Sequence, residues 1–304
     1  MPNIKKFIYC FPLVYASIWG MSYIWTNELL SFGFDVISII FFRLIISSIL
    51  LFALLFATRL FKGIKRSDIK WFLLLALFEP FLYFICEING LKRTSPTISA
   101  VIVSTIPLFI PIAAYYFYRE KLTISRFIGT AVSIGGVCLV LFHKGTETTI
   151  SVSGVLLLFG SVACAVMYNS IIKKLSSSYN PIVIVAAQNL IATFYFMPLF
   201  FILDYSELSR LTIGWQQLQP LLMLGILASS VAFILCVYTV KTLGMNRASV
   251  FSTLVPVTTA IFAFLFGVED LTLIKLFGIG CVIGGLILSQ TTLTKRALAK
   301  SITK

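Results

Sequence analysis

Long apolar runs separated by short charged or turn-rich stretches limit the folds open to this chain more than any other feature. Apolar side chains make up 59% of the 304 residues, charged side chains only 12%, and the mean hydropathy is +1.00. So few polar side chains cannot cover a water-soluble globule of this size. The sequence therefore predicts an all-α polytopic membrane protein.

The apolar runs divide the chain into ten candidate transmembrane helices. A spanning helix needs about 20 apolar residues, and ten of them with short loops account for this length. The predicted spans are 7–27, 36–58, 70–91, 97–118, 124–142, 153–173, 180–203, 218–241, 246–267 and 273–290.

The net charge of +13 is interpreted as a signal of orientation. With the N-terminus inside, 18 of the 24 Lys and Arg residues fall on inner segments, five fall on outer ones, and Arg43 lies within a span. The positive-inside rule then places both termini in the cytoplasm. Nucleic-acid binding would need a solvated basic face with exposed aromatic residues, which continuous apolar runs do not provide.

The sequence offers little for catalysis or for a metal. It contains one histidine, His143, and no HExxH motif, nucleophile elbow or phosphate-binding glycine loop. Its six cysteines lie within apolar runs, without the spacing of a zinc site or a disulfide framework. We therefore expect no enzyme activity, no cofactor and no metal site.

The two halves of the chain are related by an internal repeat at an offset of 149 residues. Pro107 aligns with Pro256, Glu120 with Glu269, and Gly135 with Gly284. Five spans per repeat is an odd number, so the second half would cross the membrane in the opposite sense to the first. The predicted organisation is a first five-helix repeat at 1–145, a linker at 146–149, a second five-helix repeat at 150–292 and a basic cytoplasmic tail at 293–304.

These residues resemble a known family, the EamA-like branch of the drug/metabolite transporter superfamily. The resemblance is carried over the whole chain by the following motifs: Trp19-Gly20, Arg43, the string Pro107, Glu120, Leu122-Thr123, Gly129, Gly135-Gly136, and its copy Pro256, Glu269, Leu271-Thr272, Gly278, Gly284-Gly285. The resemblance implies ten spans in two inverted repeats and secondary transport or export of small metabolites, commonly amino acids or related compounds. The sixth span departs from the pattern because it has no Trp-Gly pair.

Three charged residues fall inside predicted spans and mark the candidate site. Placing a charge at a helix centre costs roughly 2.5–3.5 kcal/mol, so Arg43, Glu79 and Glu87 each need a reason to be there. Their depths predict an Arg43–Glu87 pair that leaves Glu79 as the freer carboxylate. Burial would favour its neutral form. Three roles stay open for Glu79: proton coupling, contact with a substrate amine, and structural hydrogen bonding.

Polar and aromatic residues at similar depths complete the expected binding site. Aromatic rings suit aromatic or cationic solutes. The candidate substrate-binding residues are Trp19, Tyr23, Glu79, Tyr83, Ser104, Tyr168, Asn169, Tyr238 and Thr253. Pro107 and Pro256 each remove a backbone donor within a span, and are expected to break the helix and take part in gating.

The expected protein is a carrier that exports a small metabolite by alternating access, and proton coupling stays open. A lipid or lipid-linked-sugar flippase, or a multidrug exporter, is the alternative with the same architecture, and a non-transporting scaffold or channel is a weaker one. The expected partners are a small-molecule substrate, the lipid bilayer and protons, with no nucleic acid. We expect a monomer or a weak homodimer in the plasma membrane, most simply the inner membrane of a bacterium.

Overall fold

Every element described in the computed structural model is a helix. The structure describes residues 10–60, 63–118, 151–205, 214–267 and 272–302, together with parts of 128–139. Within these ranges six helices are long and apolar enough to cross a membrane. They are Val36–Thr58, Arg66–Leu91, Ile98–Phe117, Val152–Leu175, Pro181–Asp204 and Trp215–Leu243. The protein is therefore a helical, multi-pass membrane protein.

The first half contains two uninterrupted helices followed by two interrupted ones. The uninterrupted helices are α2 (Cys10–Ser31) and α3 (Val36–Thr58). The third span comprises α4 (Ile69–Ala76), a π-helical segment (Leu77–Leu82) and α5 (Tyr83–Leu91), and the fourth comprises α6 (Pro96–Val103) and α7 (Ile106–Tyr118). The sequence sets the start of helix α6. Ser95 caps the helix by accepting a hydrogen bond from the Ile98 amide, and Pro96 lacks a backbone N–H at a position where that group would have no partner within the helix.

The second half has a similar series of helices. It begins with α9 (Val152–Leu175) and α10 (Pro181–Leu199), which continues as a π-helical segment (Phe200–Asp204). The eighth span comprises α12 (Trp215–Met223), a π-helical segment (Leu224–Ala232) and α13 (Phe233–Leu243). The ninth comprises α14 (Met245–Ala248), a 3-10 turn (Ser249–Thr253) and α15 (Leu254–Leu265), and the last helix is α16 (Leu273–Ile302).

Most of the predicted spans coincide with these helices within a few residues. The last helix differs, because α16 continues to Ile302 although the span was predicted to end at 290. Most of the predicted fifth span, 124–142, lies outside the described residues, although Ser133 in its middle donates to the Val282 carbonyl of α16 at 2.9 Å. The ten-span count, the boundaries of the repeats and the cytoplasmic placement of both termini stay predictions.

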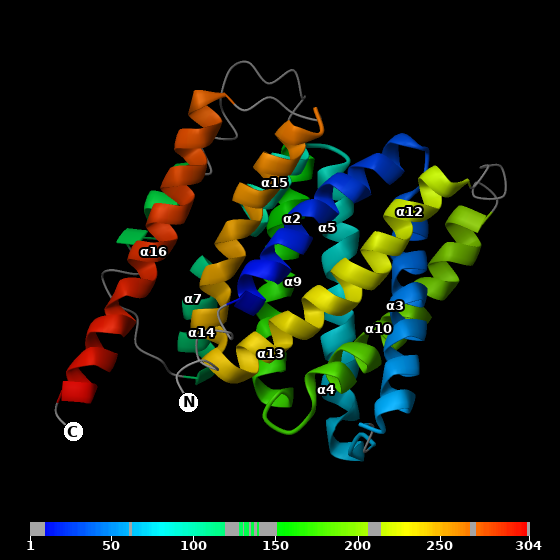
Figure 1. The fold of residues 1–304 in the computed structure, drawn as a ribbon, viewed down its shortest axis with the longest axis horizontal. Coiled ribbons are helices and arrows are strands. Elements are labelled where there is room, and N and C mark those ends of the chain that lie inside the picture. The colour runs from blue at the N-terminus through cyan, green and yellow to red at the C-terminus, as the bar shows by residue number, and fades with distance from the viewer. Residues whose placement is uncertain are drawn as a thin grey trace.

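Helices of the two halves pack directly against one another. In Figure 1, α2 crosses α15, α3 lies beside α10, and α16 stands at one edge of the bundle. The α2–α15 crossing depends on Gly20, since a Cβ atom there would lie 2.1 Å from Oγ1 of Thr258. Thr259 donates to the Gly20 carbonyl at 3.2 Å, so the two backbones meet without an intervening side chain.

Among the described spans, the third and fourth are interrupted within their length, and so are the eighth and ninth, their counterparts in the second half. At the 149-residue offset the π-helical segment Leu77–Leu82 falls within Leu224–Ala232. The fourth and ninth spans both change helix type immediately before a proline, Pro107 in α7 and Pro256 in α15. Non-helical backbone at membrane depth is tolerated only where it meets protein or a polar cavity. The matched interruptions therefore mark the region where a cavity is expected.

Candidate functional site

A cavity lies among the interrupted spans and is lined by residues from both halves of the chain. Helices α2, α3 and α5 contribute from the first half, and α9, α13 and the start of the ninth span from the second. About 80 Å³ of it is open to the centres of water molecules, whereas one water needs only about 10–15 Å³. The cavity therefore has room for several waters or for a small organic group.

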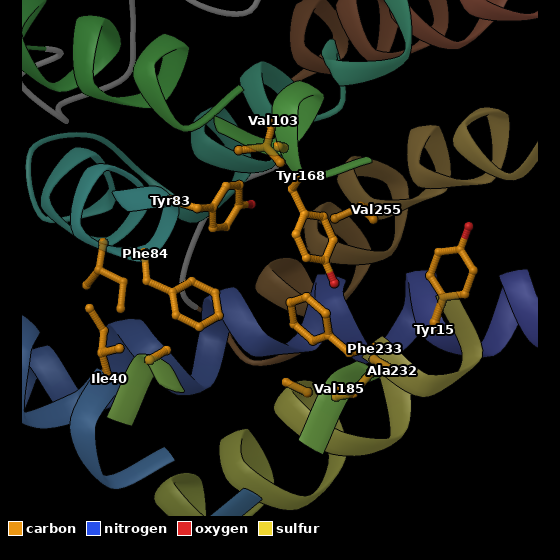
Figure 2. Close-up of a cluster of buried hydrophobic side chains, with 14 of the residues drawn as sticks. Tyr15, Ile40, Tyr83, Phe84, Val103, Tyr168, Val185, Ala232, Phe233 and Val255 are labelled. Atoms are coloured by element: carbon orange, nitrogen blue, oxygen red, sulfur yellow. The ribbon is translucent and has the colours of Figure 1, made fainter. Parts of the chain in front are cut away.

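Aromatic rings from four helices form a continuous wall of this cavity, with Phe233 at its centre. The centroid of its ring lies 5.3 Å from that of Trp19, 6.2 Å from that of Tyr168 and 6.4 Å from that of Phe84. Figure 2 shows Tyr83 and Phe84 of α5, Tyr168 of α9 and Phe233 of α13 converging on one space. These rings give the cavity an apolar but polarisable surface that stacking or cationic ligands favour.

The carboxylate of Glu87 is held by two tyrosines. Tyr23 of α2 and Tyr83 of α5 donate to the same oxygen, Oε1, at 2.9 and 2.5 Å. Hydrogen bonds to an ionised acceptor are among the stronger ones in proteins. Two of the expected site residues thus orient a third and link the first span to the third.

Glu79 also lines the cavity but has no such support. It is only 6% exposed, and none of the residues that the structure describes donates a hydrogen bond to its carboxylate. Its backbone (φ −147°, ψ 122°) leaves the helical region, which separates α4 from α5 at this point. The interruption thus coincides with a buried acid whose carboxylate receives no hydrogen bond from the described residues.

The expected ion pair between Arg43 and Glu87 is absent. Both residues are described and line the same cavity, but no nitrogen–oxygen distance between them is within 4.0 Å. Arg43 Nε instead donates to Ser229 Oγ at 2.8 Å, and its guanidinium carbon lies 4.2 Å from the centroid of the Phe84 ring. A position along a helix gives no direction, so it could not reveal that Ser229, in the π-helical segment of the eighth span, is a hydrogen-bond partner of Arg43.

That segment is held in place by a buried polar network between α3, α10 and the eighth span. Asn189 Nδ2 donates to the Ser229 carbonyl at 3.0 Å and to Ser47 Oγ at 2.7 Å. Ser47 Oγ lies 2.7 Å from Ser230 Oγ, and Ser230 donates to the Gly225 carbonyl at 2.9 Å. The network satisfies backbone acceptors that the interrupted helix would otherwise leave unpaired in an apolar medium.

The structure brings most of the predicted site residues together. The following line the cavity: Trp19, Tyr23, Arg43, Glu79, Tyr83, Glu87, Tyr168 and Asn169.

Four other predicted residues lie elsewhere. Ser104 is buried and donates to the Val101 carbonyl of its own helix, and Pro107 and Pro256 are buried at the starts of α7 and α15 without lining the cavity. Tyr238 is 39% exposed and packs edge-on against Phe11. Depth alone did not reveal which face of the helix each occupies. The side chain of Thr253 lies outside the described residues.

Sequence reasoning missed three aromatic residues of the cavity: Tyr15, Phe84 and Phe233. Two signals could have found them. Tyr15 lies one helical turn before Trp19, and Phe84 and Phe233 occupy equivalent positions at the 149-residue offset. The repeat could therefore have been used to search for pairs of equivalent aromatic residues.

Comparison with known proteins places this architecture in a family. The model of the EamA-like transporter family matches the chain twice, over residues 6–142 and 152–291. The chain belongs to the EamA-like transporter family. It is thus a member of a family of membrane transporters, and the resemblance found in the sequence is confirmed.

Its relatives share this general function. It is 25% identical over 253 residues to the uncharacterized transporter YetK of Bacillus subtilis, covering 81% of this chain and 76% of YetK. An uncharacterized transporter of Archaeoglobus fulgidus is 26% identical over 225 residues, which is 74% of this chain and 79% of that protein. A solved crystal structure matches with a TM-score of 0.71 and 14% identity, covering 94% of this chain and 98% of the other, which supports the fold alone.

Proposed function

We propose that this EamA-family protein is a secondary-active exporter that moves a small metabolite, an amino acid or a related compound, across a bacterial plasma membrane by alternating access. The observation that carries the proposal is the cavity lined by both halves, in which Glu79 receives no hydrogen bond from the part of the chain that the structure describes. Transporters built from inverted repeats bind substrate near the midplane, at the repeat interface and beside discontinuous helices.

Proton coupling through Glu79 completes the proposal. The titratable groups that interact electrostatically with it are Glu87, Tyr83, Tyr23, Cys164, Tyr168 and Cys236, and Arg43 lines the same cavity. Glu87 is the other carboxylate among them, and Tyr23 and Tyr83 already donate to it. Glu79 is therefore the carboxylate that is better placed to accept a proton when the cavity is empty and to release it when substrate binds.

Reconstituted protein can test this cycle. Proteoliposomes loaded with a pH-sensitive dye would receive, one at a time, amino acids and their decarboxylated amines. We expect at least one of these to change the internal pH in vesicles with the native protein, and Glu79→Gln to abolish the change. Glu28→Gln is the matched control, since Glu28 is exposed at the end of α2.

Two results would contradict the proposal. A proton signal that survives in Glu79→Gln would exclude Glu79 as the coupling group. Movement of fluorescent phospholipids between leaflets, with no flux of any soluble compound, would favour a flippase instead, and flux of chemically unrelated dyes would favour a multidrug exporter.

A further inference from the structure

We propose that the cavity selects an organic ammonium ion, a protonated amine on an apolar ring-sized body, over the corresponding zwitterion or carboxylate. This inference rests on the proposed function and narrows its substrates, amino acids and related compounds, to the amines among them. It follows from the charge balance of the cavity, from the direction of its hydrogen bonds and from its aromatic wall.

The charge balance leaves one carboxylate without a matching cation. Among the residues that the structure describes, the cavity is lined by two acids, Glu79 and Glu87, and by one basic residue, Arg43. The charge of Arg43 interacts with that of Glu87, and its guanidinium group lies on the Phe84 ring. Ionised Glu79 therefore lacks a counter-charge, which a bound ammonium ion would supply and a carboxylate would not.

The hydrogen bonds around the cavity point the same way. Four of its tyrosines donate their single hydroxyl proton to protein: Tyr15 to the Ala248 carbonyl at 2.9 Å, Tyr168 to Gln188 at 3.0 Å, and Tyr23 and Tyr83 to Glu87. Each hydroxyl thus has only lone pairs to offer a ligand. A ligand that donates hydrogen bonds fits these four hydroxyls, whereas a carboxylate finds no donor among them.

The aromatic wall suits the same ligand. Trp19, Tyr168 and Phe233 lie in ring-to-ring contact on the side of the cavity formed by α2, α9 and α13. The faces of aromatic rings attract cations, tryptophan most strongly, and the effect grows when the cation leaves water. Val103 and Ile106 line the cavity as well and offer apolar contacts for the body of the ligand.

A series of ligands with one shared ring isolates the effect of charge. Phenethylamine, phenylalanine, 3-phenylpropionate and 2-phenylethanol differ in the charge of their polar groups. Their affinities for the purified full-length protein in detergent would be measured by titration calorimetry at constant pH. We expect phenethylamine to bind most tightly, with phenylalanine and phenylpropionate weaker than the neutral alcohol.

The variant Glu79→Gln should remove this preference. Losing a charged partner of a hydrogen bond predicts an amine affinity lower by about tenfold or more, with little change for phenylethanol. Glu28→Gln should bind like the native protein.

Three outcomes would overturn the proposal: tighter binding of phenylalanine or phenylpropionate than of phenethylamine, no binding of any of the four, or an unchanged amine affinity in Glu79→Gln. The ligand series on the native protein decides the matter even if the variant does not fold. Because binding is measured without a membrane, an amine that binds but is not transported would refute the proposed function and leave the ligand class intact.

Discussion

The third and eighth spans occupy equivalent places in the two repeats, yet only one of them brings a carboxylate to the cavity. Both contain a π-helical segment at the same point, Leu77–Leu82 in one and Leu224–Ala232 in the other. At the 149-residue offset Glu79 corresponds to Ala228 and Glu87 to Cys236. Both spans keep the interruption of the helix, whereas the two carboxylates that line the cavity both lie on the third span.

The surroundings of the two segments explain why they differ. The third span presents Glu79 to the cavity, whereas Ser229 and Ser230 of the eighth take part in hydrogen bonds with Arg43, Ser47 and Asn189. The same local geometry therefore serves as a site in one half and as a packing element in the other. Four changes test this comparison, from the largest expected effect to the smallest.

Moving the acid to the second repeat should be the most damaging change. Ala228 is fully buried, so Ala228→Glu would force a larger, charged side chain into the packed interior. We expect a loss of about 3 kcal/mol, the cost of a charge at a helix centre. The measurement is the thermal stability of the detergent-solubilised protein by size-exclusion chromatography after heating. Ala228→Ser is the control, and native stability in Ala228→Glu would show that both repeats can hold the acid.

The close approach of the eighth span to α3 should also be specific to the second repeat. The residue equivalent to Ala76 is Gly225, where a Cβ atom would lie 2.5 Å from Cγ2 of Ile46. Gly225→Ala is therefore expected to lower stability by about 1–3 kcal/mol through overpacking. Gly160→Ala is the control, because its nearest contact would be Cys86 Sγ at 3.4 Å, and it should be nearly neutral in the same heating experiment. Equal behaviour of the two variants would contradict the prediction.

The hydrogen bonds of Asn189 should matter more than those of an asparagine on the third span. Asn189→Leu removes the donor to the Ser229 carbonyl and to Ser47, and is expected to cost about 1 kcal/mol. Asn89 donates only to the Ile85 carbonyl of its own helix, so Asn89→Leu should cost less. The free energy of unfolding of each variant would be measured by denaturant titration in mixed micelles. A larger loss for Asn89→Leu than for Asn189→Leu would refute the role of the network.

The smallest effect is expected at the loop between α9 and α10, which contacts the ends of both the third and the eighth span. Tyr179, between α9 and α10, donates to Asp68 at 2.7 Å at the start of the third span. Its carbonyl accepts from Lys241 of the eighth span at 3.2 Å. Tyr179→Phe removes the hydrogen bond to Asp68 and the one that the hydroxyl accepts from the Lys65 amide at 3.2 Å, but keeps the contact with Lys241. Because the loop is partly exposed, we expect a loss of only about 0.5–1 kcal/mol.

The pH dependence gives this variant a signature of its own. Partial burial, followed by the hydrogen bond to Asp68, raises the pKa of Tyr179 above its ordinary value of 10.0. A raised folded-state pKa stabilises the protein below the ordinary pKa, and this contribution is lost as the pH rises through the folded-state value. Stability of the native protein should thus fall above about pH 10 more steeply than that of Tyr179→Phe. If the stabilities of the native protein and of Tyr179→Phe decreased equally above about pH 10, the result would contradict this prediction.

Much of the site could be predicted because a charge inside an apolar run is conspicuous. Arg43, Glu79 and Glu87 were found from hydropathy alone, and all three line the cavity. Their partners could not be found in this way, since a position along a helix gives depth but not direction. Arg43 therefore contacts Ser229 rather than Glu87, and Tyr238 faces away from the cavity that it was expected to line.

The sequence by itself determined the class of protein, the approximate helix positions and the family. Each depends on local composition or on residues in register at the 149-residue offset. The tertiary structure decided which half of each interrupted span faces the cavity, and that Tyr15, Phe84 and Phe233 help to form its wall. These outcomes depend on contacts between segments far apart in the chain, such as Gly20 against Thr258 and Arg43 against Ser229. In an apolar medium such contacts are set by close packing and by paired polar groups, which no pattern within one segment specifies.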